Sequence, residues 1–132
     1  MTTMIDKVAW IQIQDGRVLS ARSKGKDTYY LPGGKREPGE TDEQTLIREI
    51  REELTVAIDP ETLAFVGTFE AQAHGKAENV TVQMSCYTGA YSGELRPSAE
   101  IEEFAWLTYA DRSRVSPVCQ RIFDHLHERQ WI

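Results

Sequence analysis

A chain of 132 residues, 40% hydrophobic and 27% charged, has an ordinary globular composition, and its length suits one domain, residues 1–132. The net charge of −6 argues against a nucleic-acid partner, because such surfaces need a basic footprint. No apolar run is long enough to span a membrane and no signal peptide is expected, so we expect a cytoplasmic protein with reduced, buried Cys86 and Cys119.

Strand-forming segments surround a central helix. Runs of β-forming residues separated by turn residues predict strands over 7–14, 17–22, 29–31, 56–58, 63–73, 79–91 and 104–107. Asp15-Gly16 is typical of a hairpin turn. Ser116-Pro117 predicts the start of a second helix, with proline at its first position and an apolar face reaching about Arg129. Strands, a helix, more strands and a last helix indicate an α+β fold.

The central helix can be placed from local chemistry. Thr41 can cap it and Gln44, three residues later, can reach back, which is the capping-box pattern. Leu46, Ile50 and Leu54 recur every four residues, so this face should be buried. Thr55 follows the helix where a glycine would end it more easily, so the helix must end differently or accept strain of about 1 kcal/mol.

The same helix carries three acidic residues on another face. Glu49, Glu52 and Glu53 cluster roughly 120° around the helix from the apolar stripe. Glu49 and Glu53 are a like-charged i,i+4 pair, which a helix selected only for stability would avoid. Convergent carboxylates suit Mg²⁺ or Mn²⁺, since hard cations prefer oxygen ligands. The alternative is a solvated acidic face without chemistry.

The spacing of these residues resembles the Nudix box. Gly34 is followed by five residues, Glu40, seven residues, and then Arg48-Glu49-Ile50-x-Glu52-Glu53. Every fixed position of the box matches except one, because Thr55 stands where the family has glycine. The resemblance implies the Nudix fold, with a mixed β-sheet sandwiched between the box helix and the C-terminal helix.

The resemblance also implies a reaction, namely metal-dependent hydrolysis of a nucleoside diphosphate linked to another group. Glu52, Glu53 and Gly33 are expected to hold the metal, with Glu49 as a third ligand or the base. Glu40 should support this group from the loop. Arg48 is expected to orient a glutamate, either Glu49 or Glu52. The cofactor is expected to be Mg²⁺, with Mn²⁺ as the alternative.

Further candidates lie outside the helix. Glu100 precedes the last strand where Nudix proteins often place another metal-binding or water-activating glutamate, and a structural loop carboxylate is the alternative. Arg22 ends the second strand and is a candidate phosphate contact, with a solvated surface arginine as the rival. Gly34 is expected at the substrate site. Tyr29 and Tyr30 alternate faces, so one should pack inward while the other, assigned as Tyr30, contacts substrate.

The substrate stays open at this level. The first hypothesis is a nucleoside triphosphate, cleaved to the monophosphate and pyrophosphate. The alternatives are ADP-ribose, a nucleotide sugar or a dinucleoside polyphosphate, or a non-catalytic module that only binds a nucleotide. Membranes are not expected as partners, whereas a homodimer is left open because many Nudix proteins are dimeric.

Overall fold

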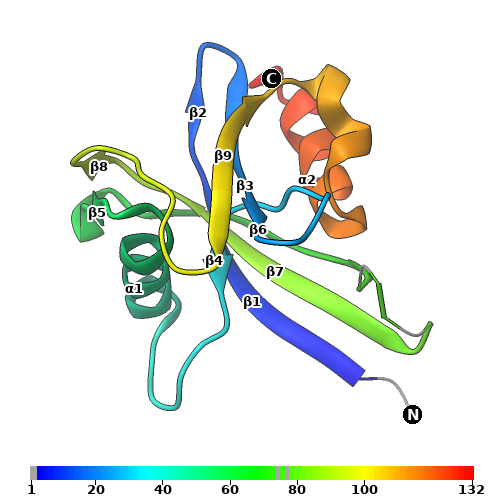
Figure 1. Cartoon of the computed structure of the whole chain (residues 1–132), viewed down its shortest axis with the longest axis horizontal. Helices are drawn as coiled ribbons and strands as arrows, with labels where there is room; N and C mark the ends of the chain where they lie inside the picture. The colour runs from blue at the N-terminus through cyan, green and yellow to red at the C-terminus, as the bar shows by residue number, and fades with distance from the viewer. Residues whose placement is uncertain (1–2, 74, 77) are drawn as a thin grey trace.

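The computed structural model of the chain describes residues 3–73, 75–76 and 78–132. Helices α1 (Asp42–Leu54) and α2 (Pro117–Glu128) lie on opposite sides of the strands (Figure 1). Short 3₁₀ helices cover Pro60–Thr62 (η1) and Tyr109–Arg114 (η2). The strands are β1 (Thr3–Ile11), β2 (Ile13–Gln14), β3 (Arg17–Ser23), β4 (Gly33–Gly34), β5 (Ala57–Ile58), β6 (Ala64–Gln72), β7 (Val80–Thr88), β8 (Tyr91–Ser92) and β9 (Ile101–Leu107).

The largest sheet is mixed, as predicted. Its order is β4-β1-β7-β6, in which β1 runs parallel to β7 and the other neighbours are antiparallel. A second sheet, β2-β3-β9, is antiparallel, and β5 pairs with β8. The α+β fold class is therefore confirmed. In the described part of the chain, neither helix is long and apolar enough to cross a membrane.

Several strand boundaries differ from the prediction because pairing between distant segments decides them. The predicted strand at 29–31 is wrong, since Tyr29 and Tyr30 form only isolated bridges. Gly33–Gly34, predicted as loop, forms β4 against Val8 and Ala9. A Cβ on Gly33 would lie 2.0 Å from the backbone oxygen of Val8, so only glycine permits this approach.

Other strands also have different limits. β1 begins at Thr3 instead of residue 7, because its largely exposed start pairs with β7, and the run predicted over 7–14 is divided between β1 and β2. The run predicted over 79–91 is split, since its end, β8, pairs with β5. β9 begins at Ile101 instead of residue 104.

Alternate residues of β1 build two separate hydrophobic cores. Val8 and Trp10 pack toward α1, in the cluster that contains the predicted stripe Leu46, Ile50 and Leu54. Ala9 and Ile11 instead pack toward α2, with residues that include Val118, Cys119, Ile122, Phe123 and Leu126. Each buried leucine or isoleucine contributes about 1.5–3 kcal/mol, so both helices are firmly attached to the sheet. Cys86 and Cys119 are buried and unbonded, as expected.

Helix α1 begins and ends with defined caps. The predicted capping box is present, with Gln44 N–H donating to Thr41 Oγ1 (3.1 Å) and Thr41 N–H donating to Gln44 Oε1 (3.0 Å). At the other end Thr55 adopts φ +62°, and its N–H donates to the Arg51 carbonyl at 3.1 Å. The helix therefore ends in the left-handed conformation that a β-branched residue resists.

This strain predicts a stability difference between two variants that both lack the Thr55 hydroxyl. Thr55→Gly should be more stable than Thr55→Ala by about 1 kcal/mol, because only glycine adopts positive φ without a Cβ penalty. Urea unfolding of the two variants measures the difference. Equal stabilities would show that the left-handed turn carries no strain.

Candidate active site

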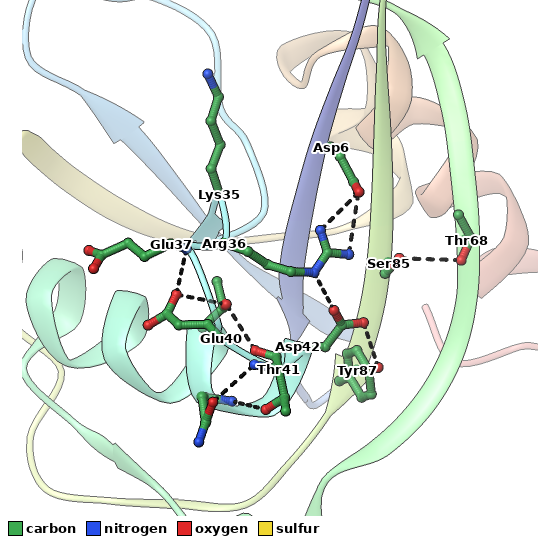
Figure 2. A network of polar contacts seen from close by, with 12 residues as sticks. Asp6, Lys35, Arg36, Glu37, Glu40, Thr41, Asp42, Thr68, Ser85 and Tyr87 are labelled. Carbon is green, nitrogen blue, oxygen red and sulfur yellow. Dashed lines mark hydrogen bonds and ion pairs between the residues drawn. The ribbon is translucent and has the colours of Figure 1, made fainter.

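The loop between β4 and α1 is fixed to the main sheet by an arginine bridge. Arg36 donates to Asp6 of β1 (Nη1 to Oδ2, 2.9 Å) and to Asp42 of α1 (Nε to Oδ1, 2.6 Å). The second oxygen of Asp42 accepts a hydrogen bond from the Tyr87 hydroxyl at 2.8 Å. Figure 2 shows Arg36 between the two aspartates, with Tyr87 beyond Asp42. The start of α1 is thus attached to β1 and β7.

Arg48 connects three carboxylates of the predicted constellation. Its guanidinium makes a two-point contact with Glu40, at 2.7 Å from Nε to Oε2 and 2.9 Å from Nη2 to Oε1. Nη1 donates to Glu49 Oε1 at 3.0 Å and lies 3.6 Å from Glu52 Oε2. Arg48 lowers the pKa of Glu40 to about 2, since the ion pair favours the charged carboxylate. Arg48 therefore lies next to both Glu49 and Glu52, the two alternatives predicted from the sequence, while its two-point contact is with Glu40.

Glu53 is a buried carboxyl group beside other carboxyl groups. It is 6% exposed, and its Oε1 accepts a hydrogen bond from Gly33 N–H at 3.1 Å. Burial raises the pKa of Glu53 to about 8, and the neighbouring Glu49 and Glu100 add to this rise. The pKa of Glu49 is also raised, first by burial, although Arg48 opposes the shift. An added cation would therefore be favoured beside the carboxyl groups of Glu49, Glu53 and Glu100.

Gly34 makes room for Glu49. A Cβ at this position would lie 2.4 Å from the Glu49 carboxyl carbon and 2.6 and 2.8 Å from its oxygens. The absence of a side chain at Gly34 therefore leaves the space that the Glu49 carboxylate occupies.

One cavity of about 520 Å³ collects most of the predicted site residues. Its wall includes Tyr30, Gly33, Gly34, Glu49, Glu53 and Glu100. Tyr29 is buried at 6% exposure, whereas Tyr30 lines the cavity and also packs against the hydrophobic core, so its contact with substrate stays a prediction. Glu100, assigned from the sequence with a structural alternative, thus lies in the same cavity as two glutamates of α1.

Three predicted site residues, Arg22, Arg48 and Glu52, are not on this wall. Arg22 is absent from the cavity wall, because its guanidinium binds Glu103 (Nε to Oε1, 3.2 Å) and the Lys26 carbonyl (Nη1, 2.8 Å). The side chain of Glu52 is 53% exposed and also lies outside the wall, next to Arg48.

The sequence analysis missed a group of cations on the same wall. Lys7, Lys26, Lys35 and Lys76 line the cavity. Within the described residues none of them forms an ion pair with a carboxylate, whereas several arginines do. One signal was available, because Lys7 interrupts the apolar alternation of Ile5, Ala9 and Ile11 on one face of β1. The other lysines come from separate loops.

The donor set fits a hard divalent cation, although no ready-made cage is present. Among the described residues, no three aspartate, glutamate, histidine or cysteine side chains converge as a metal site. Arg48 donates to Glu49 and the Gly33 N–H donates to Glu53, while the pKa of each of these carboxyl groups is raised, chiefly by burial. Carboxylate oxygens of this kind are ligands for Mg²⁺ or Mn²⁺.

The buried Glu53 predicts a pH dependence of stability in the absence of metal. Its folded-state pKa of about 8 lies above the ordinary value of 4.5, so the folded protein holds the proton more tightly. Stability is then lost as the pH rises toward and through 8, by at most about 1.4 kcal/mol per pH unit. This loss is tested by measuring the free energy of unfolding of wild type and Glu53→Gln in EDTA between pH 5.5 and 8.5, a range of about three pH units.

In that experiment the unfolding free energy of Glu53→Gln should fall less steeply with pH than that of wild type. At the alkaline end of the range the variant should be the more stable protein. Parallel curves for the two proteins would contradict the assignment of a buried, proton-binding Glu53.

Comparisons with known proteins agree with this geometry. A segment of 49 residues is 41% identical to the 8-oxo-dGDP phosphatase NUDT18 of Homo sapiens, covering 37% of this chain and 15% of that protein. Another of 53 residues is 45% identical to an RNA pyrophosphohydrolase of Halorhodospira halophila, covering 40% of this chain and 28% of that protein. These matches span under a third of the length of either curated relative.

The whole fold has a solved counterpart. The E. coli ORF135 protein gives a TM-score of 0.77 at 23% identity, covering 98% of this chain and 92% of that chain. The NUDIX domain profile matches residues 5–124, which include β4, the arginine bridge and all of α1. The chain therefore belongs to the NUDIX domain family.

Proposed function

We propose that the protein is a Mg²⁺-dependent pyrophosphohydrolase that cleaves a nucleoside triphosphate to a monophosphate and pyrophosphate. The observation that carries this proposal is the shared cavity, where Glu49, Glu53 and Glu100 lie on the same wall as four lysines that form no ion pair with any described carboxylate. Acidic groups alone would repel a phosphate, and lysines alone would not hold a cation. A metal-bound polyphosphate needs both.

The metal ligands follow from the position of each oxygen donor. Glu53 and Glu49, with the more exposed Glu52, would hold Mg²⁺, or Mn²⁺ in its place, beside Gly33. When bound, the ion neutralises charge that develops on the phosphate oxygens. Arg48 keeps Glu49 in place through the 3.0 Å hydrogen bond and is itself held by Glu40.

The attacking water needs a base. Glu49 and Glu100 both line the cavity, and one of them takes the water proton. The raised pKa of Glu49 brings that group closer to neutral pH, which suits this role.

The lysines favour the triphosphate within this class of reaction. A triphosphate carries more negative charge than ADP-ribose or a nucleotide sugar, and the cationic wall complements it. The names of the two curated relatives, a phosphatase and a pyrophosphohydrolase, support hydrolysis of phosphate compounds. Because those matches are short, they give no support for a particular base.

The first test is product release from a panel of nucleoside triphosphates, ADP-ribose, nucleotide sugars and dinucleoside polyphosphates, with and without Mg²⁺. We expect pyrophosphate from a triphosphate, and only with metal. Glu53→Gln should lose about 100-fold or more in kcat while remaining folded, because a metal ligand is replaced by a neutral amide. Glu43→Gln, an exposed position on the same helix, is the matched control and should keep wild-type activity.

Each alternative outcome has a meaning. A nucleoside monophosphate released together with a sugar phosphate from ADP-ribose or a nucleotide sugar, with no pyrophosphate from any triphosphate, would move the assignment to a diphosphate conjugate. Nucleotide binding without turnover of any compound would support the non-catalytic module instead.

A second test uses the contact between Gly34 and Glu49. Gly34→Ala should reduce kcat by about 100-fold, because the new methyl group would overlap the Glu49 carboxyl group and force it to move. Gly39→Ala is the control, since Gly39 has φ +83° with open space around it. It should lower stability by about 1 kcal/mol without loss of activity. If Gly34→Ala kept full activity, the position of Glu49 would be irrelevant to catalysis.

A further inference from the structure

The loop over residues 93–100 binds the end of helix α1 through its backbone. The last carbonyl groups of a helix have no partner inside it. Arg96 N–H donates to the Leu54 carbonyl at 3.0 Å, and Ser98 N–H donates to the Glu53 carbonyl at 2.9 Å. The loop thus completes the turn of the helix that carries Glu53, whose side chain lines the cavity.

Thr55 adds a side-chain hydrogen bond to the same contact. Its Oγ1 donates to the Glu94 carbonyl at 3.1 Å, at the start of the loop. The glycine that the Nudix box has at this position could not make this bond, although it would suit the φ of +62° better. Thr55 is exposed and lies outside the cavity wall, so its effect on the site must be indirect. Backbone strain that a protein retains is often linked to a functional site.

The far end of the loop carries Glu100 into the cavity. Ala99 adopts φ +51°, a left-handed conformation that is unfavourable for a residue with a Cβ. The Glu100 carbonyl accepts a hydrogen bond from Lys24 N–H at 2.8 Å, which fixes this end of the loop to the chain after β3. The Glu100 side chain lines the cavity, and its carboxyl group interacts with that of Glu53. The position of the Glu100 carboxyl group therefore depends on how the loop is held at both ends.

We propose that Thr55 is a positioning residue. Its hydroxyl group holds the loop over residues 93–100 against the end of α1 and thereby keeps the Glu100 carboxyl group beside Glu53. This inference rests on the proposed function, in which Glu49 or Glu100 takes the water proton, and adds a residue that controls where Glu100 lies. The one residue that departs from the box thus serves the site through the loop.

The first test measures the loop directly, without metal or substrate. Thr55→Ser keeps the hydroxyl group, whereas Thr55→Ala differs from that variant only by the missing oxygen atom. Hydrogen exchange of the Arg96 and Ser98 amides is followed by NMR in EDTA. Both amides should exchange about fivefold faster in Thr55→Ala than in Thr55→Ser, because one hydrogen bond that holds the loop is lost.

The second test measures turnover of the nucleoside triphosphate with Mg²⁺. Thr55→Ser should keep the wild-type kcat, whereas Thr55→Ala and Thr55→Gly should each lower kcat about fivefold, with KM nearly unchanged. Thr55→Gly lacks the hydroxyl group but relieves the strained φ, so it should be more stable than Thr55→Ala. Equal losses of kcat in these two variants would therefore follow the hydroxyl group and not the stability.

Two controls separate the effect on Glu100 from a general loss of stability. Thr62→Ala removes another exposed threonine hydroxyl, which donates to the Asp59 carbonyl at 2.7 Å away from the cavity wall, and should keep the wild-type kcat. In a Glu100→Gln background, Thr55→Ala should cause no further loss of kcat, because the group that the hydroxyl positions has been replaced.

The inference fails if the two amides exchange equally fast in Thr55→Ser and Thr55→Ala, or if Thr55→Ala and Thr55→Gly keep the wild-type kcat. It also fails if Thr62→Ala loses as much activity, or if the loss caused by Thr55→Ala persists in the Glu100→Gln background. Failure of the proposed function is seen separately, because wild type then hydrolyses no triphosphate with Mg²⁺ while the difference in amide exchange persists.

Discussion

The burial of Glu53 beside Glu49 and Glu100 is the constraint on which the rest of the site depends. A carboxylate at 6% exposure beside two further carboxyl groups is unfavourable unless a proton or a cation compensates it. The protein supplies only partial compensation, through the Gly33 N–H and the Arg48 guanidinium. Stability for this arrangement comes from the two hydrophobic cores that hold α1 and α2 against β1. The fold thus maintains a buried carboxyl group beside other carboxyl groups, an arrangement that fits the proposed metal site.

The cavity combines two opposite electrostatic walls. Carboxylates on one part of the cavity wall suit a divalent ion. Lysines that form no ion pair within the described residues suit the phosphates that accompany such an ion. The arginines are already engaged with carboxylates, as Arg36 is with Asp6 and Asp42, so they fix the framework. Lysine ammonium groups remain available to the ligand. This division between structural arginines and cavity-lining lysines is consistent with the proposed binding of an anionic substrate to an acidic protein.

Local chemistry allowed the central helix and the family to be predicted, because the capping box, the apolar stripe and the box spacing all lie within neighbouring residues. The mixed sheet and the place of Glu100 followed from the resemblance. Pairings over long sequence distances were not predictable, among them the long start of β1 against β7 and the glycine strand β4. The same limit applies to Lys7, Lys26, Lys35 and Lys76, which come from separate segments of the chain and line one cavity. Arg22 was misleading for a related reason, since its partner Glu103 belongs to β9.

The most direct test of this account is the number of protons released when Mg²⁺ or Mn²⁺ binds at pH 7. Calorimetry in two buffers of different ionisation enthalpy measures that number. With the Glu53 pKa near 8, wild type should release about one proton per metal ion, because the carboxyl group must ionise to bind it. The Glu53→Gln variant should bind metal more weakly and should release no proton from position 53. Tight metal binding without proton release, or an unchanged Glu53→Gln variant, would contradict the account.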